Sequence, residues 1–177
     1  LTGFVAPSDG RVSLCGHDIQ EEPLAARKQL GYLPEGAPCY AEMTPRGFLE
    51  FIADIRGLSG QLRQSRLDEV IETMHLGPVL NQTIETLSKG FKRRVGLAQA
   101  ILHDPQVLIL DEPANGLDPQ ARIDMRLLLL RLAEMGKTLI VTSHILPELA
   151  RVCDLIAIIT KGKLRAFGTL DEIMRDI

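Results

Sequence analysis

The chain has 177 residues, of which 45% are hydrophobic and 24% charged, the balance of a soluble globular domain of ordinary size. Its net charge of −3 provides no basic field, so we expect no nucleic-acid partner. The three widely spaced cysteines and the lack of any uncharged apolar stretch of roughly 18 residues disfavour a zinc site, a disulfide framework and a membrane span.

The first half of the chain predicts two short strands and then a helical block. GRVSLCG (10–16) has the alternation of an edge strand, and LGYLPE (30–35) is a second strand that ends at a proline. From residue 45 to 76 the apolar spacing becomes helical, with Thr44 as the first cap. The first of these helices is expected to bury one face made of Phe48, Phe51, Ile52 and Ile55.

The second half alternates helices and strands. Ser88 caps a helix that ends near residue 103, and VLIL (107–110) is uniformly apolar, as in a strand covered on both faces of a parallel sheet. A helix from Pro119 to Gly136 follows, and TLIVTS (138–143) repeats the buried-strand pattern. A short helix, two strands and a last helix are expected at 146–153, 155–160, 163–168 and 170–177.

This order of elements predicts the fold class and the domain organisation. Strands that alternate with helices indicate an α/β fold with a mostly parallel sheet flanked by helices. The helix-rich stretch from about 36 to 103 interrupts the alternation and predicts an inserted α-helical subdomain within one domain that spans residues 1–177.

Two acids and an imidazole fall where such sheets bind ligands. Asp111 and Glu112 end one predicted strand and His144 follows the next, and the carboxyl ends of parallel strands share one rim. One carboxylate there can hold Mg²⁺ while its neighbour polarises a water molecule. Two exposed acids at a strand end are the common alternative, and the Gly-Leu-Asp-Pro turn that follows at 116–119 disfavours it.

A second candidate site is the amino end of the helix that Ser88 caps. Free backbone N–H groups and the helix dipole favour an anion beside Ser88, Lys89 and Gly90. An ordinary serine cap with a surface lysine is the competing interpretation. The basic run Lys89, Lys92, Arg93 and Arg94 is interpreted as a solvated helix face.

Five segments in this order resemble the nucleotide-binding domain of ABC transporters. They are GYLPE (31–35), similar to the Q-loop; LSKGF (87–91), similar to the signature LSGGQ; LILDE (108–112), similar to Walker B with the catalytic glutamate; NGLD (115–118), similar to the D-loop; and SH (143–144), similar to the switch histidine. Glu35, Lys89 and Phe91 depart from the family pattern. The pairing of GYLPE with LSKG resembles the bacterial exporters of the ABC-2 class.

The resemblance implies a P-loop NTPase-like fold and an ATPase that uses ATP and Mg²⁺. It implies that Asp111 and Glu35 are metal ligands, that Glu112 is the general base for the attacking water, and that His144 contacts the γ-phosphate. The remaining nucleotide-binding residues that it implies are Ser88, Lys89, Gly90 and Asp118, together with Glu35.

The resemblance also implies partners. Two such ATPase domains pair head to tail, as a homodimer or a heterodimer, and act on transmembrane permease subunits to move a substrate across a membrane. The protein is therefore expected at the cytoplasmic face of a bacterial cell membrane. Candidates for the permease contact are Pro38, Tyr40, Met43 and Phe48, for which core packing is an equal alternative.

Two other functions stay open at this point. A soluble ABC ATPase that acts on ribosomes or DNA shares the same motifs, although such proteins usually carry two domains or a coiled-coil insertion and tend to be basic. A non-catalytic regulatory copy is favoured by the departures Glu35, Lys89 and Phe91 and by the lack of a phosphate-binding loop.

The phosphate-binding loop G-x-x-x-x-G-K-[ST] has no copy in the 177 residues. Gly136-Lys137-Thr138 does not qualify, because Arg131 stands where the first glycine is required and a strand, not a helix, follows. Residues 1–3 resemble the end of the helix that follows the loop, so we expect the loop just upstream of them.

The 177-residue chain by itself is therefore expected neither to bind nor to hydrolyse ATP, because it lacks the loop that holds the phosphates. Calorimetric titration of this chain with Mg-ATP should give no heat of binding, whereas a protein that includes the upstream sequence should bind. A micromolar affinity of the isolated chain would contradict this expectation.

Overall fold

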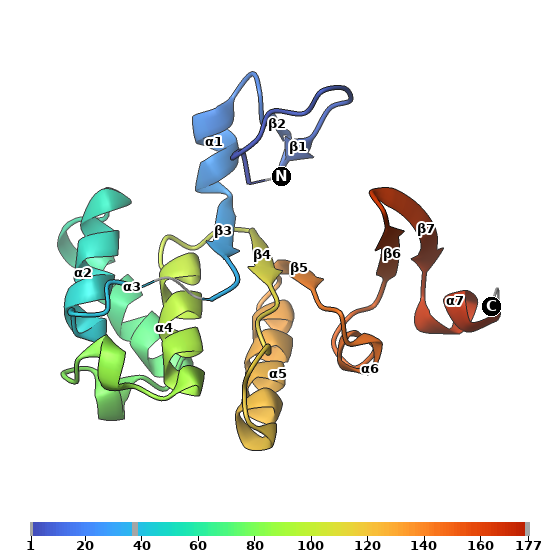
Figure 1. Cartoon of the computed structure of the whole chain (residues 1–177). Helices are drawn as coiled ribbons and strands as arrows, with labels where there is room; N and C mark the ends of the chain where they lie inside the picture. Colours follow the sequence, from blue (N-terminus) through green and yellow to red (C-terminus); the bar gives the residue numbers. More distant parts are fainter. Residues whose placement is uncertain (1, 37–38, 176–177) are drawn as a thin grey trace.

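A parallel sheet lies at the centre of the computed structural model, which describes residues 2–36 and 39–175 (Figure 1). Its strand order is β3-β4-β5, with bounds Leu30–Leu33, Val107–Asp111 and Thr138–Thr142. Residues 107–110 of the central strand β4 are apolar and buried, with Leu108 and Leu110 fully buried, as expected of a strand covered on both faces. The α/β class with a parallel sheet, predicted from the sequence, is confirmed.

Three helices stand on one side of the sheet (Figure 1). They are α2 (Pro45–Ile55), α3 (Gly60–Thr73) and α4 (Lys89–Ile101), with the short 3₁₀ segments η1 (Gly77–Val79) and η2 (Ile84–Thr86) between α3 and α4. Side chains of α2, α3 and α4 pack in one hydrophobic core with β4, so a separate helical subdomain at 36–103 stays a prediction. Both predicted caps form, since Thr44 accepts from the Gly47 N–H at 3.2 Å and Ser88 from the Phe91 N–H at 3.3 Å.

One prediction about a buried face is wrong in part, and a second is wrong. In α2, Phe48 is buried as expected and Ile52 is partly buried, but Phe51 is 39% exposed and Ile55 is 63% exposed. Leu49 and Ala53 are buried instead, because the buried stripe is rotated toward α3 and α4. The strand β5 was expected to be covered on both faces, but its residues are exposed or half-buried. Within the described residues β5 pairs only with β4, so it is an edge strand.

The amino-terminal part contains elements that the sequence did not predict. The edge strand expected at 10–16 is reduced to β1 (Ser13–Leu14), which pairs antiparallel with β2 (His17–Asp18). A short helix α1 (Pro23–Lys28) then leads into β3. Thr2 and Gly3 are not in a helix, and Leu1 lies outside the described residues.

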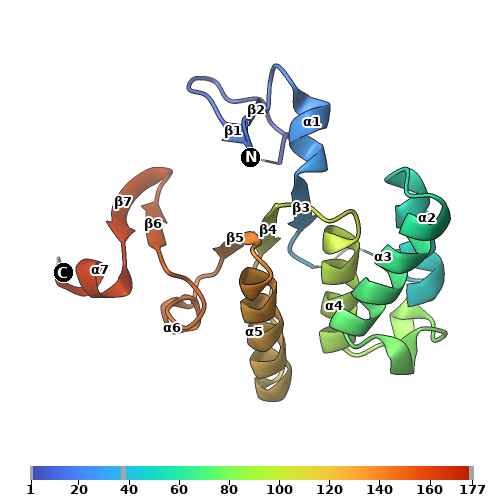
Figure 2. The ribbon, with the colours of Figure 1, turned by 180° about the vertical axis from the view of Figure 1, so that it is seen from behind.

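The carboxyl-terminal part extends from the opposite side of the sheet, as the rear view also shows (Figure 2). This part comes after α5 (Pro119–Glu134) and β5 in the chain. It consists of α6 (Leu146–Leu149), an antiparallel hairpin of β6 (Ile156–Thr160) and β7 (Lys163–Gly168), and α7 (Leu170–Arg175). Searched over the described residues, the structure has no helix with the length and apolar character needed to cross a bilayer.

A polar network fixes the end of the sheet at which β3 and β4 begin. Nε2 of His103 lies 3.0 Å from the Leu30 carbonyl oxygen, and Nζ of Lys137 lies 2.6 Å from Oδ1 of Asp104. Arg66 donates from Nε to the Leu102 carbonyl at 3.1 Å, which caps the end of α4. Lys137, the lysine of the Gly-Lys-Thr triplet, is thus engaged in an ion pair, and a strand follows it as expected.

His103 makes the stability of the fold dependent on pH. Burial, aided by the nearby charge of Arg56, lowers the pKa of His103 from 6.5 to about 4. With Nε2 donating to Leu30, a proton on the buried Nδ1 would have no acceptor among the described residues. The folded state therefore requires neutral His103, and stability is lost as the pH falls from 6.5 toward 4.

We expect His103→Gln to reduce this pH dependence, because glutamine does not titrate and its amide can still donate to the Leu30 carbonyl. The free energy of unfolding, measured with urea, should fall between pH 7 and pH 4.5 by up to about 3 kcal/mol more in the unmodified protein than in the variant. The exposed His75 provides the control, and an equal effect of His75→Gln would contradict the assignment.

Candidate functional site

The carboxyl ends of β4 and β5 bring the predicted acids to one rim of the sheet. Asp111 is the register partner of Thr142. The Thr142 hydroxyl donates to Oδ1 of Asp111 at 2.5 Å and accepts from the Glu112 N–H at 3.1 Å. One threonine, which the sequence analysis did not single out, therefore orients both acids.

Glu112 has a strained backbone. Its φ of 47° is in the left-handed region, which costs a residue with a Cβ about 1–2 kcal/mol. Besides the Thr142 hydroxyl, the Thr142 carbonyl accepts from the Glu112 N–H, at 3.2 Å. Strain of this kind is concentrated at functional sites, where the surrounding structure holds it in place.

The two predicted catalytic side chains are in contact. Nδ1 of His144 lies 2.9 Å from Oε1 of Glu112, and the side chains are 66% and 18% exposed, respectively. The hydrogen bond to Glu112, followed by the charge of Glu112, raises the pKa of His144, with smaller contributions from the charges of Glu148 and Glu35. The structure thus holds an exposed imidazole against a largely covered carboxylate.

A cavity of about 540 Å³ lies between the segment after β3, the helix α4 and the turn after β4. It is lined by Glu35 and Gly36 after β3, by Lys89, Lys92 and Arg93 of α4, and by Asn115 and Gly116 of the turn after β4. Nδ2 of Asn115 donates to Oε1 of Glu35 at 3.1 Å, which links two segments that are 80 residues apart in sequence. A Cβ built at Gly116 would lie 3.7 Å from Nζ of Lys89, so Lys89 points toward its own chain's turn.

Arg93 contradicts the interpretation of the basic run as a solvated helix face. It is only 7% exposed, and its guanidinium reaches the Pro34 carbonyl at 3.5 Å. Burial lowers its pKa, while the nearby carboxylates of Glu35, Asp111 and Glu112 raise it. A cation in this place offsets the repulsion among the acids.

Arg94, the next residue of the basic run, is likewise engaged with another part of the chain. Its guanidinium donates to Oδ2 of Asp124 at 2.7 Å, which ties α4 to α5. Positions 89, 92 and 93 share one face of a helix, whereas position 94 lies on another face. This helical spacing is the feature of the sequence that could have predicted different surroundings for Arg94 than for the other three residues.

The amino ends of α4 and α5 lie against each other. Ser88 caps α4, and Asp118 caps α5 by accepting from the Ala121 N–H at 2.9 Å. A Cβ at Gly90 would lie 3.3 Å from Cβ of Ala121, so the glycine permits this close packing. The nucleotide contacts expected of Ser88, Gly90 and Asp118 stay predictions.

The residues at the rim fit a magnesium ion that arrives with a nucleotide. Among the described residues no group of three or more His, Cys, Asp or Glu side chains is arranged to hold a metal. Mg²⁺ is usually held by one or two carboxylates together with substrate phosphates and water, rather than by a complete protein cage. Asp111 and Glu35, both near Arg93, provide donors of that kind.

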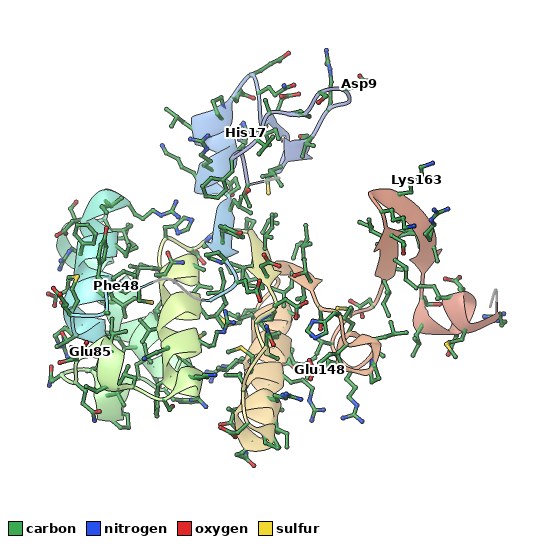
Figure 3. All side chains as sticks on the ribbon, viewed as in Figure 1. Asp9, His17, Phe48, Glu85, Glu148 and Lys163 are labelled. Atoms are coloured by element: carbon green, nitrogen blue, oxygen red, sulfur yellow. The ribbon has the colours of Figure 1, made fainter. Side chains whose placement is uncertain are left out.

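The four candidates for a permease contact are not equivalent. Phe48 is buried in the core of the helical segment, where Figure 3 labels it, and is not available to a partner. Tyr40 is exposed, with its ring 5.6 Å from that of Phe51, and Met43 is half-buried. Pro38 lies outside the described residues.

Comparisons with known proteins give matches over most of the chain. The family model described as "ABC transporter" matches residues 1–115. Over 98% of its length the chain is 38% identical to the ABC transporter ATP-binding protein sll0415 of Synechocystis and 34% identical to the linearmycin resistance ATP-binding protein LnrL of Bacillus subtilis. It spans 49% and 56% of these relatives.

A solved structure titled "ATP binding subunit of ABC transporter" superimposes on 99% of the chain with a TM-score of 0.84 and 32% identity. The chain covers 73% of that structure. The similarity of fold therefore extends over both the sheet and the helical segment.

The contact between His144 and Glu112 leads to a prediction about titration. We expect Glu112→Gln to lower the pKa of His144 toward 6.5, because the substitution removes the carboxylate that stabilises the imidazolium. An NMR titration of the His144 ring protons measures the shift. Glu85→Gln, which changes an exposed acid on the helical segment, is the control, and an equal change in both variants would contradict the contact.

Proposed function

The chain belongs to the ABC transporter family, and from this premise we propose that it forms part of an ATP-hydrolysing subunit that couples ATP binding and hydrolysis to movement of a substrate across a membrane. The observation that carries the proposal is the contact between Glu112 and His144 at the rim shared by β4 and β5. A water molecule beside a carboxylate of this kind is in position to be deprotonated.

We assign distinct roles to the residues at the rim. Glu112 orients and deprotonates the attacking water, and His144 keeps the Glu112 carboxylate in place and donates to the γ-phosphate. Asp111 and Glu35 would hold Mg²⁺, which supplies neutralisation of phosphate charge when it is bound. Glu35, which stands where the family has glutamine, keeps an oxygen donor and adds a negative charge.

The buried Arg93 supports this assignment on electrostatic grounds. Three carboxylates at one rim repel each other, and each would favour protonation without a compensating cation. Arg93 lies near Glu35, Asp111 and Glu112, so these acids can stay ionised before a metal-bound nucleotide arrives.

We further propose that the subunit pairs with a second ATPase domain and with transmembrane permease subunits at the cytoplasmic face of the membrane. Ser88, Gly90 and Asp118 would bind the nucleotide of the paired domain, because the amino ends of α4 and α5 lie side by side. Lys89, whose Nζ approaches Gly116 of its own chain, would contribute positive charge to nucleotide binding. The superimposed structure is described as the ATP-binding subunit of an ABC transporter, which supports assembly with further subunits.

The decisive experiment replaces Glu112 by glutamine in the full-length protein. We expect turnover of ATP to fall by a factor of roughly 10² or more, because general base catalysis typically contributes 10²–10⁴-fold. ATP binding, measured by calorimetry, should stay within a few-fold of the unmodified protein, because Glu112 acts on water and not on the nucleotide.

Glu134→Gln is the matched control, since it changes an exposed acid at the far end of α5. Retention of turnover in Glu112→Gln would rule out the assignment of the base. Absence of ATP turnover in the unmodified full-length protein would favour the regulatory alternative instead.

A further inference from the structure

We infer that Arg122 is a positioning residue that connects the turn after β4 with the segment that carries His144, and so holds His144 against Glu112. Only the effect that we expect on ATP turnover rests on the proposed function. The contacts themselves belong to the described chain and can be tested without any nucleotide.

Arg122 makes two contacts with different parts of the site. Its Nε donates to the Leu117 carbonyl at 3.0 Å, at the end of the turn after β4. Its Nη1 lies 3.5 Å from Oε1 of Glu148 on α6. Figure 3 shows Glu148 in the space between α5 and α6.

These contacts close a ring. From Glu112 the chain turns through Asn115, whose N–H donates to the Glu112 carbonyl at 3.1 Å, and reaches Leu117. Arg122 connects Leu117 to Glu148, α6 leads back to His144, and His144 returns to Glu112 at 2.9 Å. A displacement of α6 is therefore transmitted both to the His144 contact and to the turn.

Packing alone does not fix α6, and this makes the ring significant. None of the four residues of α6, all of which the structure describes, is buried. A cavity of about 290 Å³ separates α6 from α5 and β5, with Met125, Leu129, Val141 and Val152 among its lining residues. The Arg122–Glu148 pair therefore connects α5 and α6, between which there is little packing.

The geometry favours arginine. Two different nitrogen atoms of the guanidinium face a carbonyl and a carboxylate, whereas a lysine would have to reach both acceptors with a single nitrogen atom. The side chains of Arg122 and Glu148 are 45% and 31% exposed, so their attraction is screened by solvent and adds little to overall stability. The expected consequence of their loss is misplacement of His144 rather than unfolding.

The test compares Arg122→Lys and Arg122→Gln with Arg126→Lys in the full-length protein. Arg126 lies one turn further along α5 and lines the same cavity, and its side chain forms no ion pair or hydrogen bond with the described residues. We expect both Arg122 variants to lower kcat by roughly tenfold with KM for ATP within twofold, because the fault lies in alignment and not in binding.

The pKa of His144 distinguishes a positioning role of Arg122 from a merely electrostatic or structural one. Removal of a nearby cation in Arg122→Gln would by itself raise this pKa, whereas loss of the contact with Glu112 lowers it toward 6.5. We expect a fall in both Arg122 variants, with unchanged melting temperature, and no change in Arg126→Lys.

A rise or no change in the His144 pKa of the Arg122 variants overturns the inference, as does an equal fall in Arg126→Lys. Glu148→Gln keeps the size of the partner and should reproduce the fall in kcat. If the unmodified protein lacks ATPase activity, the proposed function fails, while the pKa measurement still decides whether Arg122 positions His144.

Discussion

The parallel register of β4 and β5 is the constraint on which the candidate site depends. Because Asp111 pairs with Thr142, the residues that follow each strand leave the sheet side by side. The Thr142 hydroxyl and carbonyl then hold Glu112 in a left-handed conformation that its own side chain disfavours. His144 reaches Glu112 because two strands end at the same level.

The charge arrangement follows from this crowding. Three carboxylates from two segments converge near one rim, and the chain places a buried guanidinium, Arg93, among them. A buried cation without partners would be costly, and the acids without a cation would repel each other. The two costs offset each other, and the negative charge that the acids carry in excess of Arg93 can attract a metal cation.

The helix α5 connects the parts of the site. At its amino end Asp118 caps the helix and Ala121 packs against Gly90, and Asp124 pairs with Arg94 of α4. Arg122 turns in the other direction, toward α6. One helix therefore contacts both the element beside the predicted nucleotide contacts and the segment of the switch histidine, which gives a physical route between them.

The sequence by itself determined the α/β class, the main strands and helices, and the residues at the strand ends, because apolar periodicity and motif spacing are local properties. A short apolar run that follows turn residues, such as VLIL after HDPQ, predicts a strand, and a serine or threonine before a helix predicts its cap. The family resemblance rested on the same local segments.

Only the tertiary structure decided which side chains are covered and which distant groups meet. Arg93 is buried, Phe51 is exposed and β5 is an edge strand because these properties depend on neighbours far away in sequence. The contacts of Thr142 with Asp111, of Asn115 with Glu35 and of Arg122 with Glu148 join residues from separate elements, and no local pattern encodes them.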